Sequence, residues 1–69
     1  MLVLGQKVRL INRSMLHPVF SDEGEVIKVH EKDNRVGWVI FLPFEGDLVG
    51  SGISETLNLH ETELEVLNE

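Results

Sequence analysis

The sequence predicts an all-β fold: a small closed or half-open barrel of about five short strands, with one helical turn near the C-terminus. Three observations lead to this prediction. Runs rich in β-branched and aromatic residues recur along the chain and are separated by turn-forming residues. No apolar pattern of helical period extends beyond one turn. With 69 residues and no cysteine, the chain has room for one small core, so we expect a single domain over residues 1–69.

The first half of the chain predicts three strands. Charged and apolar side chains alternate over Gln6–Ile11, which is typical of a half-buried strand. Asn12–Glu23 is rich in Asn, Ser, Pro and Asp and is expected to form a loop. The β-branched run Glu25–His30 and the apolar run Val36–Leu42 flank a polar connector, so we expect them to pair as a hairpin.

The second half predicts a long loop and two short strands. Phe44–Thr56 contains three glycines and two serines, and we expect it to be a mobile loop. Leu57–Leu59 follows as a strand, His60–Leu64 as a single helical turn, and Glu65–Leu67 as the last strand. We expect one core, formed by the apolar residues Val8, Leu10, Val26, Val29, Leu59, Leu64 and Val66.

The charge distribution narrows the choice of partners. Twelve acidic and six basic residues give a net charge of −6, which opposes non-specific binding to nucleic acid or to an anionic membrane. Lys7, Arg9 and Lys28 would form a nucleic-acid face, but no aromatic residue is interleaved with them, so nucleic acid is disfavoured as a partner. The C-terminal segment carries an acidic edge made of Glu61, Glu63 and Glu65.

No complete catalytic or metal-binding pattern occurs in the sequence. His17, His30 and His60 are too widely spaced to include the close ligand pair of most zinc sites, so we interpret them as capping or surface residues. His60 begins an H-E-x-x-H pattern, but Leu64 occupies the position of the second histidine. No phosphate-binding or nucleophile motif is complete either. We therefore expect no catalytic residue, no metal, no cofactor and no enzymatic activity.

Membrane insertion and secretion are not indicated. The longest uncharged apolar stretch, Val36–Phe44, is far shorter than the roughly 20 residues that span a bilayer. The first residues lack the basic lead and cleavage signal of a secretory peptide. We expect a cytoplasmic protein, or one bound peripherally to the cytoplasmic or stromal side of a membrane complex; the sequence does not indicate its oligomeric state.

Aromatic and apolar side chains are the candidates for a binding surface. The third predicted strand is apolar on both faces, because alternation sets Val36, Trp38, Ile40 and Leu42 against Val39 and Phe41. Either the long loops cover the outer face or it stays open to a partner. Aromatic and arginine anchors dominate many interfaces, so the candidate partner-binding residues are Arg13, His17, Phe20, Trp38 and Phe44. We expect Phe20→Ala to weaken binding and to leave the thermal midpoint nearly unchanged.

Four segments are spread over almost the whole chain: Gly5–Leu10, Gly24–Val29, Trp38–Phe41 and His60–Leu67. Their order resembles that of the SH3-like small barrels, which include the KOW-type modules of ribosomal and transcription proteins. Within this group the chain is most similar to the PsaE family of small photosystem I subunits, with which it shares a glycine- and serine-containing run at Val49–Ser54. The basic residues with which that family receives ferredoxin have no match at Ile40–Glu45.

This resemblance implies an SH3-like barrel that acts as a non-enzymatic protein-interaction module or as a small accessory subunit of a larger complex. In its PsaE-like form, the complex would be an electron-transfer or photosynthetic one. The first alternative is a KOW-like module that binds nucleic acid or associates with the ribosome. The second alternative is an acidic inhibitor that presents Glu61, Glu63 and Glu65 to a basic protein surface.

Overall fold

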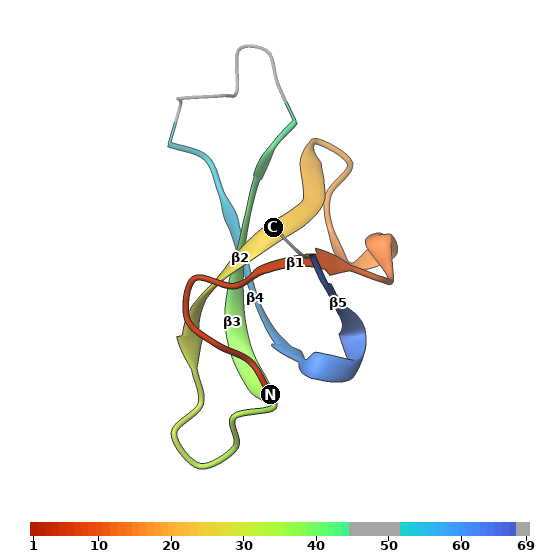
Figure 1. The fold of residues 1–69 in the computed structure, drawn as a ribbon. Helices are drawn as coiled ribbons and strands as arrows, with labels where there is room; N and C mark the ends of the chain where they lie inside the picture. The colour runs from red at the N-terminus through yellow and green to blue at the C-terminus, as the bar shows by residue number, and fades with distance from the viewer. Residues whose placement is uncertain (45–51, 68–69) are drawn as a thin grey trace.

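A computed structural model describes residues 1–44 and 52–67. These residues form one antiparallel sheet in the order β4-β3-β2-β1-β5. The strands are β1 (Lys7–Leu10), β2 (Phe20–Val29), β3 (Val36–Pro43), β4 (Glu55–His60) and β5 (Leu64–Val66), and the 3₁₀ turns are η1 (Arg13–Met15) and η3 (Glu61–Glu63). The sheet curls into a half-barrel (Figure 1). The all-β prediction is confirmed, and the arrangement is compatible with an SH3-like barrel.

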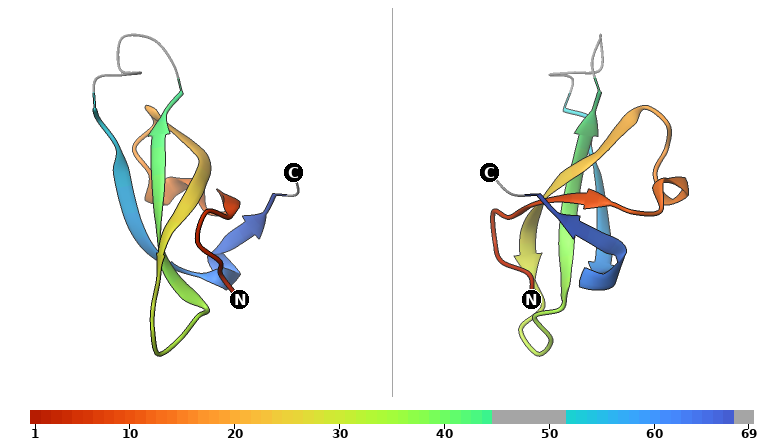
Figure 2. Two further views of the ribbon diagram at one scale, coloured as in Figure 1. Left: turned by 60° about the vertical axis from the view of Figure 1, so that its left-hand side comes forward. Right: turned by 45° about the vertical axis from the view of Figure 1, so that its right-hand side comes forward.

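Gly24 lies where the sheet bends. It pairs with Val8 of β1 and with Phe41 of β3, and the register of β2 against β3 shifts between Phe20 and Gly24. A Cβ atom at Gly24 would lie 2.6 Å from the carbonyl oxygen of Ile40, so a larger residue would push the two strands apart. The bend lets β1 and β5 lie across the other three strands, as the two views in Figure 2 show.

The core lies inside the curl of the sheet. Its buried hydrophobic residues are Leu2, Val8, Leu10, Leu16, Phe20, Val26, Val39, Phe41, Leu59 and Leu64. Most of the predicted core is therefore confirmed, and Val29 packs against its edge. The prediction for Val66 is wrong, since this side chain is 50% exposed. Val66 is the last residue of β5, a three-residue strand at the edge of the sheet.

Two predicted loop boundaries are wrong. β2 begins at Phe20, so the last four residues of the expected loop Asn12–Glu23 belong to a strand. Their polar composition disfavours a strand locally, but pairing with β1 overrides it, with Arg9 opposite Glu23 in the register. β4 begins at Glu55, earlier than predicted. Most of the expected mobile loop Phe44–Thr56 falls on residues 45–51, which lie outside the described residues.

The predicted C-terminal turn and strand are confirmed. η3 occupies Glu61–Glu63, with His60 as its N-terminal cap, and β5 follows directly. Both contacts of the N-terminal cap are local: the His60 ring accepts from the Thr62 N–H group at 3.2 Å, and the Glu63 carboxylate accepts from the His60 N–H group at 3.1 Å. Such a reciprocal capping box depends on residues two and three positions apart, which explains why it can be predicted from sequence.

The two faces of β3 divide as the alternation predicts. Val39 and Phe41 are fully buried, whereas Trp38 and Leu42 are exposed and Ile40 is half-buried. The sheet therefore has an apolar outer face along β3, and the described part of the long loops does not cover it fully.

Candidate protein-binding site

Four of the five predicted partner-binding residues gather where the η1 loop meets the end of β3. The Arg13 guanidinium lies 5.0 Å from the centre of the Phe44 ring, and its Nη2 donates to the carbonyl oxygen of Phe20 at 2.6 Å. The rings of His17 and Phe20 meet edge to face at 6.5 Å. A further hydrogen bond, from the Phe44 N–H group to the Val19 carbonyl at 3.1 Å, holds the loop against β3.

Phe20 and Phe44 differ in their surroundings within this cluster. Phe20 is only 6% exposed and belongs to the core, whereas Phe44 is 58% exposed. The expectation that Phe20 is a surface anchor whose loss leaves stability unchanged is therefore wrong. Its backbone pairs with Pro43 at the far end of β3, and this pairing turns its ring inward. Phe44, His17 and the half-buried Arg13 are the members of the cluster that remain accessible at the surface.

Trp38 lies apart from this cluster. It is 41% exposed on the outer face of β3, where its register neighbours are Lys28 of β2 and Asn58 of β4. The sequence analysis left open whether Trp38 is core or surface. The structure places it on the surface, but not beside Arg13, His17, Phe20 and Phe44.

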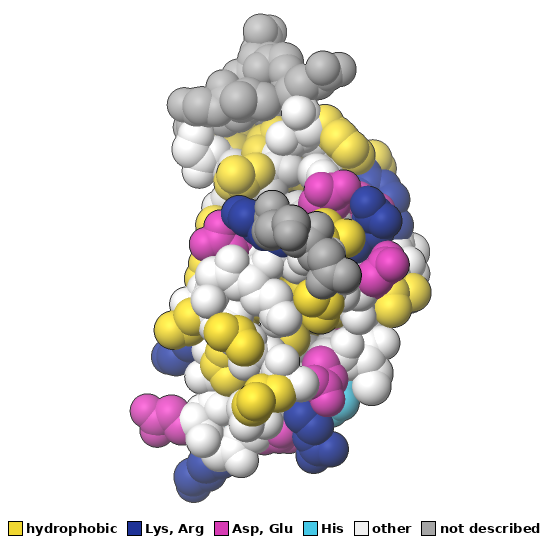
Figure 3. Space-filling view, viewed as in Figure 1, with side chains coloured by type: hydrophobic (Ala, Val, Ile, Leu, Met, Phe, Trp, Pro, Cys, Tyr) yellow, Lys and Arg dark blue, Asp and Glu magenta, His cyan; other side chains and the backbone are white. Residues whose placement is uncertain are grey.

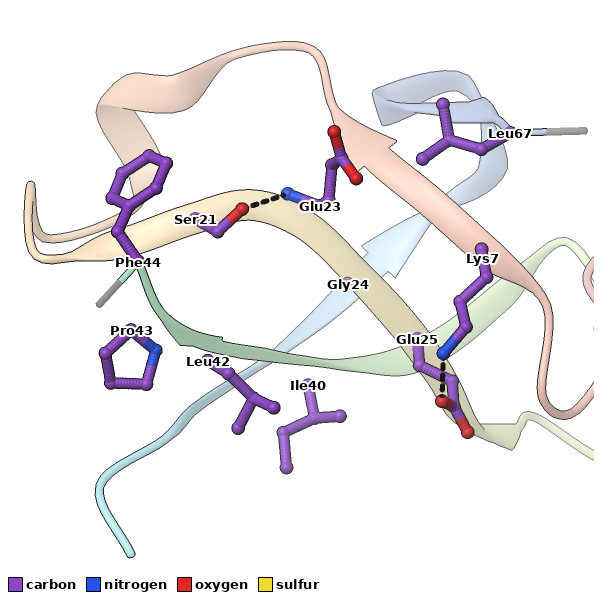
Figure 4. Close-up of a pocket in the computed structure, with 10 residues that line it drawn as sticks. All are labelled: Lys7, Ser21, Glu23, Gly24, Glu25, Ile40, Leu42, Pro43, Phe44 and Leu67. Carbon is purple, nitrogen blue, oxygen red and sulfur yellow. Dashed lines mark hydrogen bonds and ion pairs between the residues drawn. The ribbon is translucent and has the colours of Figure 1, made fainter. Parts of the chain in front are cut away.

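A groove extends from the aromatic cluster along the outer face of β3, and we call it the β3 groove. Its apolar lining is Ile40, Leu42, Pro43, Phe44 and Leu67, and its volume is about 490 Å³. Figure 4 shows Ile40, Leu42, Pro43 and Phe44 along one side, with Ser21, Glu23, Glu25, Lys7 and Leu67 along the other. Leu42 is as exposed as Phe44, at 58%. An open apolar groove with polar edges is the usual form of a protein-binding surface.

The polar groups at the edge of the β3 groove are already engaged within the chain. Lys7 donates to Glu25 at 2.7 Å, and the Ser21 hydroxyl accepts from the Glu23 N–H group at 3.2 Å (Figure 4). The apolar side chains, rather than the charges, are therefore what the groove offers to a partner.

The nucleic-acid face expected at Lys7, Arg9 and Lys28 is neutralised in part by cross-strand ion pairs. Besides the pair between Lys7 and Glu25, Arg9 contacts Glu23 at 3.0 Å and Glu65 at 3.6 Å. The hydrogen bond that Arg9 donates to the Glu23 carboxylate raises the pKa of Arg9 above its usual value. The face seen in Figure 3 accordingly mixes acidic and basic side chains. Two of the three residues expected to form a nucleic-acid face are thus paired with carboxylates.

The acidic edge is engaged in a similar way. Glu65 pairs with Arg9, Glu63 accepts from the backbone N–H group of His60, and Glu61 pairs with the N-terminal ammonium. Each of the three carboxylates thus has a structural contact within the chain. This arrangement does not favour the acidic inhibitor.

The three histidines share one local role. In each, Nδ1 accepts a hydrogen bond from the backbone N–H group two residues later: His17 from Val19, His30 from Lys32, and His60 from Thr62. His60 is confirmed as the N-terminal cap of η3, and His17 and His30 are exposed surface residues. Among residues 1–44 and 52–67 there is no group of three or more His, Asp or Glu side chains placed to hold a metal ion.

Ile40, Leu42, Pro43 and Leu67 were not among the predicted site residues. The alternation along β3 does carry a signal for Leu42, which it places on the same face as Trp38. Leu67 has no such signal, because its place beside Lys7 depends on the pairing of β5 with β1; the Leu67 N–H group donates to the Lys7 carbonyl at 3.0 Å.

Comparisons with known proteins found no matching family model, no matching curated protein and no matching solved structure. In the described part of the chain, no helix has the length and apolar character needed to cross a membrane.

Proposed function

We propose that this protein is a non-enzymatic binding module that docks a protein partner in the β3 groove. The observation that carries the proposal is the joint exposure of Leu42 and Phe44 in a single groove. Exposed apolar surface of this kind gains roughly 25 cal/mol for each Å² that a partner removes from water. The Arg13 guanidinium against the Phe44 ring adds an arginine–aromatic pair of the type enriched in interface hot spots.

The partner's chemistry follows from the groove and from the overall charge. A segment bearing an exposed apolar or aromatic side chain would fill the space between Leu42 and Phe44. The net charge of −6 favours a partner with a basic surface, mainly by raising the rate of association.

The specific form of this proposal is an accessory subunit of an electron-transfer complex, as in the PsaE family. Its support is the resemblance of the motif order together with a fold compatible with an SH3-like barrel. This form of the proposal requires that the partner captured by the protein be a component of a redox complex.

The test compares three tagged proteins in extracts of the native host: the wild type, Leu42→Asp and Ile27→Asp. Ile27 is a matched control, because it is 45% exposed on β2 and does not line the groove. We expect the wild type and Ile27→Asp to retain the same protein, and Leu42→Asp to lose it by at least about tenfold, the equivalent of 1.4 kcal/mol. Equal capture by all three proteins would refute the groove as the docking site. Urea midpoints measured alongside exclude unfolding as the cause of a loss.

A further inference from the structure

A second hollow lies at the opposite end of the outer face of β3, and we call it the Trp38 pocket. Its volume is about 530 Å³, within the range typical of small-molecule sites. Trp38 and Asn58 contribute from β3 and β4, and Lys28, His30 and Lys32 contribute from β2 and the turn that follows it. None of these residues lines the β3 groove.

The Trp38 ring lies between a cation and an amide. Trp38 is directly opposite Lys28 on one neighbouring strand and Asn58 on the other. Residues paired in this way have Cβ atoms about 4.5–5.5 Å apart, so their side chains share one patch of surface. Trp38 is 41% exposed, so part of its ring surface is open to a ligand.

The charges in the Trp38 pocket differ from those elsewhere on the molecule. The other basic side chains have carboxylate or carbonyl partners within the chain: Lys7, Arg9, Arg13 and Arg35. Within residues 1–44 and 52–67, Lys28 and Lys32 form no such ion pair or side-chain hydrogen bond. Both line the Trp38 pocket, and both ammonium groups keep their full capacity to donate to a ligand.

We propose that the Trp38 pocket binds a nucleotide. The base would stack on the Trp38 ring, as bases do on exposed aromatic side chains in other proteins. The phosphate would accept charge-assisted hydrogen bonds from Lys28 and Lys32. The Asn58 amide has both donors and an acceptor to meet the edge of the base. This pocket is separate from the β3 groove, so the inference stands independently of the proposed function.

The remaining groups in the pocket limit the ligand's size and charge. Glu31 also lines the pocket and opposes an anion there. His30 Nδ1 accepts from the N–H group of Lys32, so Nε2 is the ring nitrogen that remains for a ligand. Because the whole chain carries −6, each further phosphate of a long strand adds repulsion. A single nucleotide, free or at the end of a single strand, fits these limits.

Intrinsic fluorescence tests the inference directly, because Trp38 is the single tryptophan and the chain has no tyrosine. The full-length protein is titrated with adenosine 5′-monophosphate, and then with adenosine, which lacks the phosphate. We expect saturable quenching by the monophosphate, with an affinity at least about tenfold above that for adenosine. Absence of saturable quenching up to about 5 mM monophosphate would overturn the proposal, because any binding would then be weaker than millimolar.

Charge variants distinguish binding at a defined site from simple collisional quenching of Trp38 fluorescence. Lys28→Gln with Lys32→Gln is expected to weaken monophosphate binding by at least about tenfold, and Glu31→Gln to strengthen it about twofold. Lys7→Gln is the control, because it removes one positive charge outside the pocket, and it should leave the affinity unchanged. An equal effect of Lys7→Gln and of the double variant would overturn the proposal. All of these side chains are exposed, and urea midpoints verify that each variant folds.

The source of the nucleotide is settled by a third ligand, a short single-stranded oligoadenylate. Tighter binding than that of the monophosphate, with a steep loss in salt, would support the end of a strand as the natural ligand. Equal or weaker binding would support a free nucleotide. Binding of a glutamate-rich peptide without binding of the monophosphate would overturn the inference in favour of an acidic peptide.

Discussion

The two phenylalanines of the aromatic cluster should respond to truncation in opposite ways. Phe20 is 6% exposed in the core and Phe44 is 58% exposed beside Arg13. Replacing a buried phenylalanine by alanine costs about 3–5 kcal/mol, because contacts are lost and a cavity remains. Replacing Phe44 costs about 1 kcal/mol or less, mainly the cation–π contact of an exposed pair. We therefore expect Phe20→Ala to be several times more destabilising than Phe44→Ala.

The expected loss at Phe20 is large for so short a chain. At about 0.05–0.15 kcal/mol per residue, the whole domain has roughly 3–10 kcal/mol of stability. Phe20→Ala would then remove a third or more of it, and the variant would be partly or fully unfolded near room temperature if the total lies at the low end. Phe44→Ala would lower the melting temperature by about 4–8 °C for each kcal/mol lost.

Urea unfolding, followed by Trp38 fluorescence and by far-ultraviolet circular dichroism, measures both variants on the same scale. Coincident transitions from the two probes would justify a two-state treatment. A cost below about 1 kcal/mol for Phe20→Ala would refute the assignment of this ring to the core. A larger cost for Phe44→Ala than for Phe20→Ala would refute the argument from exposure altogether.

Two further predictions concern backbone geometry and acid stability. Gly24→Ala should cost about 1–3 kcal/mol or more, because the new Cβ would meet the β3 backbone at 2.6 Å. Gly5→Ala, at φ +82° with no atom within 4 Å of its Cβ, should cost only the dihedral strain of about 1–2 kcal/mol. Equal urea midpoints for a well-folded Gly24→Ala and the wild type would contradict the close strand approach. The N–H group and guanidinium of Arg35 lower the pKa of Asp33 below 3.8. The ionised Asp33 carboxylate therefore stabilises the folded state above that pH, and this stabilisation is lost as the pH falls through the lower pKa of the folded state. The wild type should therefore exceed Asp33→Asn in urea midpoint at about pH 5 but not at about pH 2; a difference that persists at the lower pH would refute this linkage.

Short-range patterns predicted much of the sheet. The alternation at Lys7–Leu10, the β-branched run in β2 and the apolar run in β3 each lie in a strand, within a few residues of the expected bounds. The reason is that inward and outward positions in a strand follow a period of two, which is written in the sequence itself. η3 could be predicted for the same reason, since its capping contacts join residues two and three positions apart.

The candidate site could be predicted only in part. Arg13 and Phe44 were named because arginine and aromatic residues are common in interfaces, and the structure brings them together at 5.0 Å. Phe20 was assigned to the surface with the same argument, since residue type alone does not tell an exposed ring from a buried one. Leu67 had no signal, because its place in the groove depends on a strand pairing between the two ends of the chain.

The sequence alone therefore determined the fold class, the approximate strands, the inward face of most of them and the short turn that follows His60. Tertiary structure decided which charges remain available. Lys7 and Lys28 are both strand lysines in the sequence, yet Lys7 lies opposite Glu25 whereas Lys28 lies opposite Trp38. The difference arises from strand register, which is fixed by the packing of the whole core and by the shifts within β2 rather than by neighbours along the chain. The same register sets Lys28 directly opposite Trp38, where the sequence had shown only a basic residue and a distant aromatic one.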